Sequence, residues 1–497
     1  MHDTLIFSVA LIGALGLGAQ WLAWRMQAPA IVLMSLAGLA VGPLWAALAG
    51  EPLLDPTHEF GSLLRPIIAL AVAVILFEGG LALKFDDLRD AGGPVRRMVF
   101  FGGPLALVLG ALAAHYVAGL DWASAIVFAS VLIVTGPTVI MPLLRQSKLG
   151  GRTGAALKWE GIINDPIGAL LAVAAFEVVR VANTGDSAIA ITAWIIFAAA
   201  FGAALGIVFG WVMAHAFRSG WTPEFLKAPI IFASVLLCYA LADMVEGETG
   251  LVAVTAFGMT LANSRLAGIT EMRRFKENIA VLLISGVFII LTASLTPDII
   301  GRALNWRTLF FLIVMLFLVR PISIWVSTYG TLKRNEALLL GWIAPRGIVA
   351  VAISSFFGSR LIELDQEKMQ AAREAFEQAG TTGIFQYTPL FPGAASIEPL
   401  AFSIVFVTVV LHGFTIGPMA RWLGLARKGK PGILLVGVNP WSVDFAQALR
   451  KSGIEVILAD ANWRRLKPAR EAGLETFFGE VLSEDAEVRL DHARFET

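Results

Sequence analysis

The sequence predicts an all-α polytopic membrane protein that ends in a small α/β segment. Of the 497 residues, 57% are apolar and only 15% are charged, whereas charged residues make up about 25% of an average soluble domain. Apolar stretches of roughly 20 residues, the length needed to cross a bilayer core of about 30 Å, recur along most of the chain. After Pro431 the pattern changes to short β-branched runs that alternate with charged, amphipathic stretches.

We expect about thirteen membrane-spanning helices. They centre, in chain order, on residues 4–24, 28–49, 64–83, 97–118, 122–144, 155–179, 188–216, 228–244, 249–263, 277–295, 306–328, 335–358 and 399–424. The first stretch lacks a basic start and an A-x-A cleavage site, which favours a retained helix over a signal peptide.

The distribution of charge predicts the orientation in the membrane. Lysine plus arginine (38) equal aspartate plus glutamate (38), so net charge gives no indication of a nucleic-acid partner. Alternate loops differ, however: residues 84–97, 265–276 and 421–430 are basic, and residues 51–59, 243–248 and a long loop at 360–398 are acidic. Because cytoplasmic loops carry the excess of Lys and Arg, we expect the N-terminus outside and the C-terminus in the cytoplasm.

Ionisable residues inside spanning helices are expensive and by default mark functional sites. They are Glu78, Glu160, Asp165, Arg320 and Arg346. The sixth span contains the stretch WEGIINDP, in which Glu160 and Asn164 share one helix face and Asp165 is rotated about 100° from them. A carboxylate in such a place can hold either a proton or a cation. The alternative, that Asp165 only pairs with Arg320 or Arg346, stays open.

Two further spans carry Gly-Pro or Pro-Arg-Gly interruptions near their middles. Thr135-Gly136-Pro137 lies in the fifth span and Pro345-Arg346-Gly347 in the twelfth. Proline removes a backbone donor, so both helices should unwind at mid-membrane. Interrupted helices in corresponding halves of a chain indicate a transporter's ion site. Freed carbonyls and the Thr135 hydroxyl would then replace water around a small cation.

These motifs resemble those of a known family. FEGG at 77–80, TGP at 135–137, EGIIND at 160–165, RPIS at 320–323 and APRG at 344–347 are similar to motifs of the monovalent cation/proton antiporters of the NhaP and sodium/hydrogen exchanger type. The resemblance covers about residues 5–424. It implies two inverted repeats around a linker seventh helix, a six-helix core with crossed broken helices, and a homodimer formed by the remaining helices.

The resemblance also implies roles for individual residues. Asp165 would be the carboxylate for which cation and proton compete, with Asn164, Thr135, Gly136 and Glu78 as further ion-binding groups. Glu160 and Arg346 would form a buried structural ion pair, and Arg320 would support the ion path. The Asn-Asp sequence implies electroneutral exchange. Many relatives have Thr-Asp-Pro where this chain has Thr135-Gly136-Pro137, so Gly136 offers only its backbone.

The C-terminal segment is predicted to be a separate domain. We expect residues 1–428 to form the transport domain and residues 429–497 a cytoplasmic segment of strand-helix-strand-helix-strand order. It resembles the first half of an RCK-type (Rossmann) domain. Gly437 stands at the glycine turn of a dinucleotide fingerprint and Asp460 at the ribose-binding position, but the other glycines are missing. A nucleotide-free regulatory segment is therefore an equal alternative.

The expected function is secondary active exchange of Na⁺ or K⁺ for H⁺ by alternating access in the plasma (inner) membrane. Lipid surrounds the chain, and we expect no cofactor, no nucleic-acid partner and no resident metal besides the transported alkali cation. The alternative is a ligand-gated cation channel or K⁺ efflux system controlled by the C-terminal segment. No catalytic grouping supports an enzyme, and the single cysteine, Cys238, excludes an intramolecular disulfide. His412, in the last span, is expected to be a neutral packing residue.

Overall fold

A computed structural model describes residues 2–26, 28–136, 139–140, 143–144, 149, 151–184, 188–264, 269–303, 305–344, 346–378, 387–426, 432–479 and 481. The chain divides into two compact units. The larger contains residues 1–143 and 152–416, and the smaller contains residues 144–151 and 417–497. The larger unit is helical, and the smaller contains a parallel sheet.

The polytopic fold is confirmed. Within the described residues, nine helices are long and apolar enough to cross a membrane, and shorter apolar helices lie at Trp122–Val131, Thr249–Ala262 and Ile279–Ala293. The twelfth expected span is divided between two further helices, α18 (Arg334–Trp342) and α19 (Ile348–Gln378). Together these segments account for every stretch that the apolar pattern marks.

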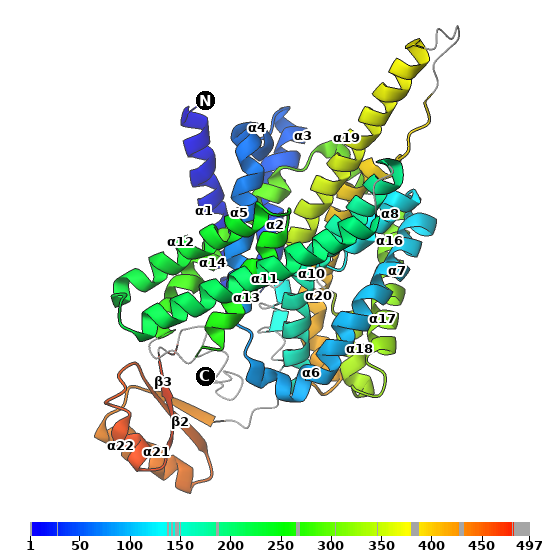
Figure 1. The fold of residues 1–497 in the computed structure, drawn as a ribbon. Coiled ribbons are helices and arrows are strands. Elements are labelled where there is room, and N and C mark those ends of the chain that lie inside the picture. Colours follow the sequence, from blue (N-terminus) through cyan, green and yellow to red (C-terminus); the bar gives the residue numbers. More distant parts are fainter. Residues whose placement is uncertain are drawn as a thin grey trace. The chain divides into compact units, whose positions relative to one another are not determined.

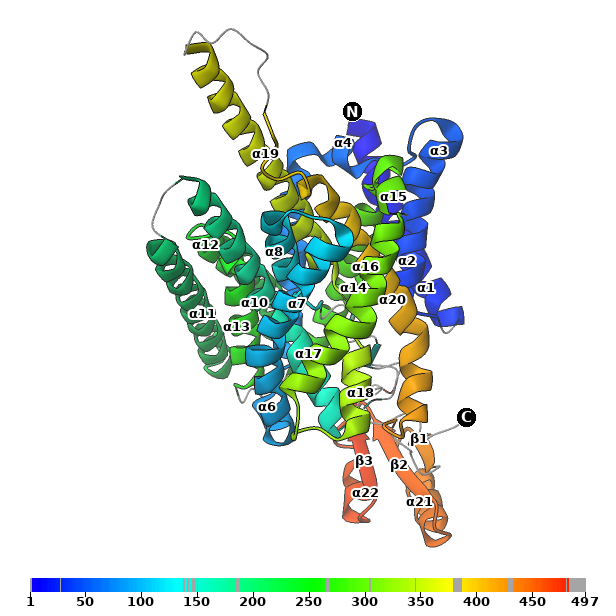
Figure 2. The same ribbon diagram turned by 90° about the vertical axis from the view of Figure 1, so that its right-hand side faces the viewer.

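The helices of the larger unit form two groups (Figures 1 and 2). In the first group, α1 packs against α2 and α14, α14 packs against α5, and α13 packs against α5, α11 and α12. The group comprises α1 (His2–Met26), α2 (Ala30–Leu39), η1 (Ala40–Leu44), α3 (Trp45–Ala49), α4 (Pro56–Phe60), η2 (Gly61–Leu63), α5 (Leu64–Leu81), α11 (Ala188–Arg218), α12 (Glu224–Asp243), α13 (Thr249–Ala262) and α14 (Ile269–Ala293).

The second group contains both interrupted spans. Its members are η3 (Phe85–Asp87), α6 (Leu88–Arg97), η4 (Met98–Gly102), α7 (Gly103–Ala113), η5 (Ala114–Ala118), α8 (Trp122–Val131), α10 (Gly151–Thr184), α16 (Trp306–Val314), η6 (Met315–Val319), α17 (Arg320–Ser327), α18, α19, η7 (Ala394–Ser396) and α20 (Ile397–Trp422). The short α15 (Pro297–Ala303) precedes α16. Helix α17 packs against α18, α7 and η4, and α8 packs against α7 and α19.

Local sequence explains where several of these helices begin. Asp121 caps α8 by accepting a hydrogen bond from the Ser124 amide at 2.9 Å, and Asn305 caps α16. Glu336 accepts from the Lys333 amide at 2.8 Å at the start of α18. These caps satisfy amides that the first turn of a helix leaves without partners.

Helix α19 differs from the expectation. Residues 360–378, expected as the first part of an acidic loop, continue α19 as far as Gln378, and this end of the helix extends beyond its neighbours (Figures 1 and 2). The i,i+3 pair Arg360–Glu363 and the i,i+4 pair Arg373–Glu377 support the polar extension. Hydropathy marks only the apolar part of a helix, so the expected end was too early.

The smaller unit has the expected strand-helix-strand-helix-strand order. Parallel strands β1 (Gly432–Val436), β2 (Glu455–Asp460) and β3 (Glu475–Phe478) form a sheet in the order β1-β2-β3, with α21 (Pro440–Lys451) and α22 (Lys467–Glu471) as connections. Val443, Ala446, Leu458 and Leu466 are among the side chains that form its core.

Candidate ion-binding site

The polar residues of the sixth span are deeply buried on α10. Glu160, Asn164 and Asp165 are 2%, 4% and 0% exposed, respectively. Helix α10 continues through Pro166, which has no amide to donate to the Ile162 carbonyl one turn earlier. The helix therefore places an acidic side chain and a carbonyl without its usual helical donor close together.

Asp165 is a fully buried carboxylate on α10. Within the described part of the chain, neither of its carboxylate oxygens has a hydrogen-bond partner. Glu248, in the turn between α12 and α13, is close enough for its negative charge to act on Asp165. A buried, unpaired polar group costs about 1–3 kcal/mol or more, so structural pairing does not explain why Asp165 is there.

Both predicted helix breaks are present. Helix α8 ends at Val131 and the backbone is not helical at Val134–Gly136, while α18 ends at Trp342 and α19 begins at Ile348. Pro137, Thr138 and Pro345 lie outside the described residues. The two breaks touch: a Cβ on Gly347 would lie 2.5 Å from the Gly136 Cα. Glycine is therefore needed at this crossing.

Helix α10 packs directly on the first break. A Cβ on Gly168 would lie 2.7 Å from the Val134 amide nitrogen. The Thr135 hydroxyl donates to the Gly161 carbonyl at 3.3 Å, and Gly161 lies one helical turn before Asp165. The structure thus brings Thr135 and Gly136 to the helix that carries Asn164 and Asp165.

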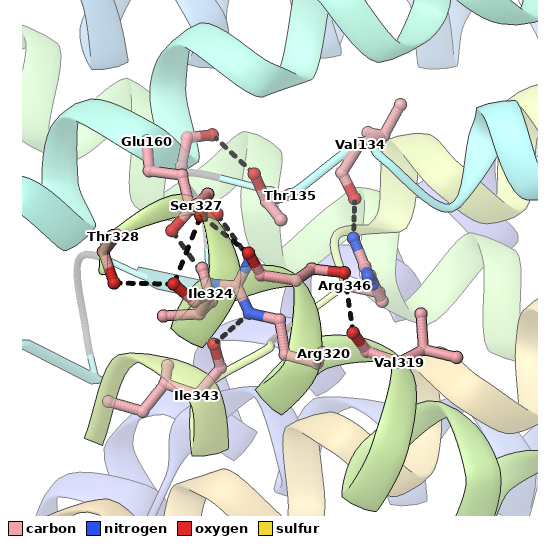
Figure 3. Close-up of polar contacts among 12 residues, drawn as sticks. Val134, Thr135, Glu160, Val319, Arg320, Ile324, Ser327, Thr328, Ile343 and Arg346 are labelled. Atoms are coloured by element: carbon pink, nitrogen blue, oxygen red, sulfur yellow. Dashed lines mark hydrogen bonds and ion pairs between the residues drawn. The ribbon is translucent and has the colours of Figure 1, made fainter. Parts of the chain in front are cut away.

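The predicted partner of Glu160 was wrong. Glu160 pairs with Arg320, whose Nη1 and Nη2 donate to the two carboxylate oxygens at 2.5 and 2.8 Å (Figure 3). Arg320 Nε also donates to the Ile343 carbonyl at 3.2 Å. The sequence shows two arginines but not which one faces α10. Arg320, the first residue of α17, joins the acidic helix to the end of α18.

Arg346 instead holds the breaks together. Its Nη1 donates to the Val134 carbonyl at 3.4 Å (Figure 3), and its backbone amide donates to the Thr408 hydroxyl of α20 at 3.3 Å. Arg346 is 4% exposed, and its Nε has no partner among the described residues. It contacts the fifth span rather than Glu160.

The remaining predicted residues lie outside the second helix group. Glu78 is half-buried near the end of α5, in the first helix group. In the smaller unit Gly437 has a positive φ of 91°. The Asp460 carboxylate accepts from the amides of Val438 and Asn462 at 2.9 and 2.8 Å. These bonds hold the pKa of Asp460 below its usual value.

Two residues that act on the candidate site, Glu248 and Thr408, could not be identified from the sequence. Glu248 was grouped with the acidic loop residues, and no spacing signal relates it to Asp165. It is also the non-glycine residue with a positive φ, at 68°, among the described positions. The Thr408 hydroxyl accepts a hydrogen bond from the Arg346 amide. Thr408 lies in an apolar span, where a single threonine is common and gives no functional signal. Both depend on tertiary packing.

Comparison with known proteins agrees with this architecture. The transmembrane sodium/hydrogen exchanger family matches residues 7–422. The chain is 23% identical over 456 residues to the K(+)/H(+) antiporter NhaP2 of Shewanella baltica, covering 89% of this chain and 72% of that protein. It is 24% identical over 442 residues to the Na(+)/H(+) antiporter NhaG of Bacillus atrophaeus, covering 85% and 75%.

Some relatives are considerably longer: the match to NhaP2 of Shewanella oneidensis, 24% identical, covers 77% of this chain and 62% of that protein. The fold resembles that of the sodium proton antiporter MjNhaP1 from Methanocaldococcus jannaschii, with a TM-score of 0.67 and 18% identity over 85% of this chain and 99% of that one. Given the extent of the family match and the touching helix breaks beside a buried carboxylate, the chain belongs to the sodium/hydrogen exchanger family.

Proposed function

We propose that this protein exchanges Na⁺ or K⁺ for H⁺ across a membrane by alternating access, with Asp165 as the shared cation and proton site. The observation that carries the proposal is the fully buried Asp165 carboxylate, which has no hydrogen-bond partner among the described residues. Its helix packs against the first of two touching helix breaks. Unwound backbone at membrane depth beside a carboxylate is how secondary transporters hold small cations.

The groups around Asp165 suit an alkali cation. The Thr135 hydroxyl donates its proton to Gly161, which leaves its lone pairs for a cation. Asn164 and the freed Ile162 carbonyl are further oxygen ligands. The Gly136 carbonyl, expected as a ligand, instead accepts from the amides of Val139 and Ile140 at 3.1 and 3.2 Å, so Gly136 serves the close approach of the two breaks rather than the cation. We place Glu78 on the ion path, on the side of the first helix group. Oxygen donors of this kind suit hard cations.

The cycle follows from competition at one carboxylate. With a proton bound, Asp165 is neutral; with a monovalent cation bound, the site is also neutral. Either loaded form can cross the membrane interior without a net charge, whereas the empty, ionised form is disfavoured there. Exchange is therefore electroneutral. The Glu160–Arg320 pair carries no net charge and keeps the core assembled in both states.

Both Na⁺ and K⁺ are proposed as substrates, because the relatives include antiporters named for each. We further propose that residues 1–428 form the transport domain and that residues 429–497 are a cytoplasmic regulatory segment. In this arrangement the N-terminus is outside, and the first helix group forms a homodimer in the plasma membrane. Because the segment keeps only the first fingerprint glycine, Gly437, we favour regulation without a bound nucleotide.

A gated channel is the alternative. A single buried carboxylate beside paired breaks suits an occluding site better than a continuous pore. The test uses purified protein in vesicles with an acidic interior and a pH-sensitive dye. Addition of Na⁺ or K⁺, but not choline, should dissipate the pH gradient, and planar bilayers should show no unitary current. Unitary cation currents without coupled proton movement would favour the channel.

A further inference from the structure

One face of α20 contacts both sides of the break in the twelfth span. Thr408, His412 and Thr415 are four and three residues apart and so share a helix face. Thr415 Oγ1 accepts from the Trp342 indole at 3.0 Å, at the end of α18. Thr408 Oγ1 accepts from the Arg346 amide at 3.3 Å. The stretch Thr408–Thr415 therefore runs alongside the break.

His412 is the unsatisfied member of this face. Both threonine hydroxyls also donate to carbonyls of their own helix, at 3.0 and 2.6 Å. The His412 ring is 0% exposed and lies edge-on to Trp342, with ring centroids 5.9 Å apart. In the described part of the chain neither ring nitrogen has a partner at full hydrogen-bond geometry, and the Trp342 carbonyl is the backbone acceptor that acts on the ring. If His412 only filled space, an apolar side chain of similar size would be more stable, because burying a polar ring without hydrogen bonds costs free energy.

The Arg346 side chain also has a buried polar group without a described hydrogen-bond partner. Its Nε is a buried donor without a described partner, while its Nη1 reaches the Val134 carbonyl. Arg346 and Arg320 both lie close enough to act electrostatically on His412, and two guanidinium groups repel a third positive charge. A neutral imidazole has one lone-pair nitrogen and one N–H. A water that accepts from Arg346 Nε–H and donates to that lone pair satisfies the Arg346 donor and the acceptor nitrogen of His412, while the ring N–H is directed at the Trp342 carbonyl.

We propose that His412 is a positioning residue for the ion site, which holds Arg346 through a shared buried water against the Val134 carbonyl. Val134 directly precedes Thr135, so this link fixes the position of the first break relative to α10. The inference rests on the proposed function for its effect on transport, because a loosened Arg346 would displace the groups assigned to the cation. The water itself is independent of that function.

The first test is a structure of the parent protein at a resolution that reveals ordered water. We expect a water within hydrogen-bond distance of both a His412 ring nitrogen and Arg346 Nε. A direct protein partner on Arg346 Nε, or an apolar contact in place of the water, would overturn the proposal whether or not the protein transports ions.

The second test compares three variants in vesicles, with Na⁺ and K⁺ as the probes. His412→Leu keeps the bulk but removes both nitrogens, and should raise the cation KM about fivefold or more, the effect of losing one hydrogen bond. His412→Gln can still bond the water and should remain within about twofold of the parent. Thr415→Val, one turn further along the same face, is the matched control and should leave KM unchanged.

The thermal midpoint separates positioning from packing. A histidine that only fills space predicts that His412→Leu keeps the parent KM and melts at the same or a higher temperature, and that result contradicts the proposal. If the parent shows no cation-dependent proton movement, the proposed function fails, and the water observed between His412 and Arg346 still decides the role of His412.

Discussion

The Glu160 carboxylate is held by both terminal nitrogens of the Arg320 guanidinium, while the third nitrogen of Arg320 binds the Ile343 carbonyl at the end of α18. One arginine thus ties the acidic helix α10 to the edge of the second break. Both side chains are buried, at 2% and 8% side-chain exposure. Removing either partner leaves the other as an unpaired charge in a low-dielectric interior.

We therefore expect Glu160→Gln and Arg320→Gln each to lower the free energy of unfolding by about 3–5 kcal/mol. The measurement is the unfolding midpoint of purified protein in detergent. Glu177→Gln is the matched control on the same helix, since its partner Arg180 is 42% exposed, and an exposed pair contributes about 1 kcal/mol or less. A Glu160→Gln protein that is as stable as Glu177→Gln, yet inactive, would assign Glu160 to the ion site.

The Thr135 hydroxyl should contribute to cation affinity. Thr135→Val preserves the shape of the side chain but removes the oxygen that bonds Gly161. Loss of one ligand worth about 1.4 kcal/mol would raise the cation KM about tenfold. Thr135→Ser keeps the hydroxyl and should behave like the parent. Equal KM values for the valine and serine variants would remove Thr135 from the set of ion ligands.

The rate of exchange should be independent of the membrane potential, because the Asp165 site is neutral in both loaded forms. The measurement is the initial rate of Na⁺-driven proton movement in vesicles at fixed pH, with the potential set by a gradient of a lipophilic anion. Asn164→Asp adds a second carboxylate beside Asp165 and should make the rate depend on the potential. A parent rate that follows the potential would show that further charge moves with the cation.

Asp460 links the stability of the smaller unit to pH. Amide hydrogen bonds from Val438 and Asn462 lower its pKa from the ordinary value of 3.8. The ionised carboxylate therefore stabilises the folded unit above about pH 3.8, and this contribution is lost as the pH falls through the lower folded-state value. Asp460→Asn should accelerate hydrogen exchange of the β1–α21 turn in the full chain at pH 7.

That difference from the parent should shrink as the pH falls below the ordinary value, after correction for intrinsic exchange rates. Asp444→Asn, on α21 of the same unit, is a suitable control that should show no such pH-dependent difference. An Asp460→Asn protein with parent-like protection at pH 7 would show that these hydrogen bonds do not support the fold.

Much of this architecture could be predicted from the sequence because it depends on local patterns. The length of the apolar stretches predicted the spanning helices. The positions of Gly and Pro predicted the breaks at Val134–Gly136 and 343–347, where backbone donors are lost. The strand-helix alternation after Pro431 likewise follows from residue type. Each of these features is decided within a few residues, so the surrounding fold need not be known.

The remaining features depend on tertiary packing. Arg320 and Arg346 are both single arginines in apolar spans, and only the rotation of α17 against α10 decides that Arg320 meets Glu160. The action of Glu248 on Asp165 arises between α13 and α10, far apart in the sequence. The polar extension of α19 follows from ion pairs that hydropathy does not register.

The central claim is that proton and cation compete for Asp165, and a grid of initial exchange rates over pH and cation concentration tests it most directly. Protons should raise the apparent cation KM, and excess cation should shift the acidic limb of the activity profile to lower pH, because binding at a shared site is reciprocal. Deletion after residue 430 should leave this shift intact, and Asp165→Asn should abolish exchange. An acidic limb that stays fixed as cation rises, or an active Asp165→Asn protein, would contradict the account.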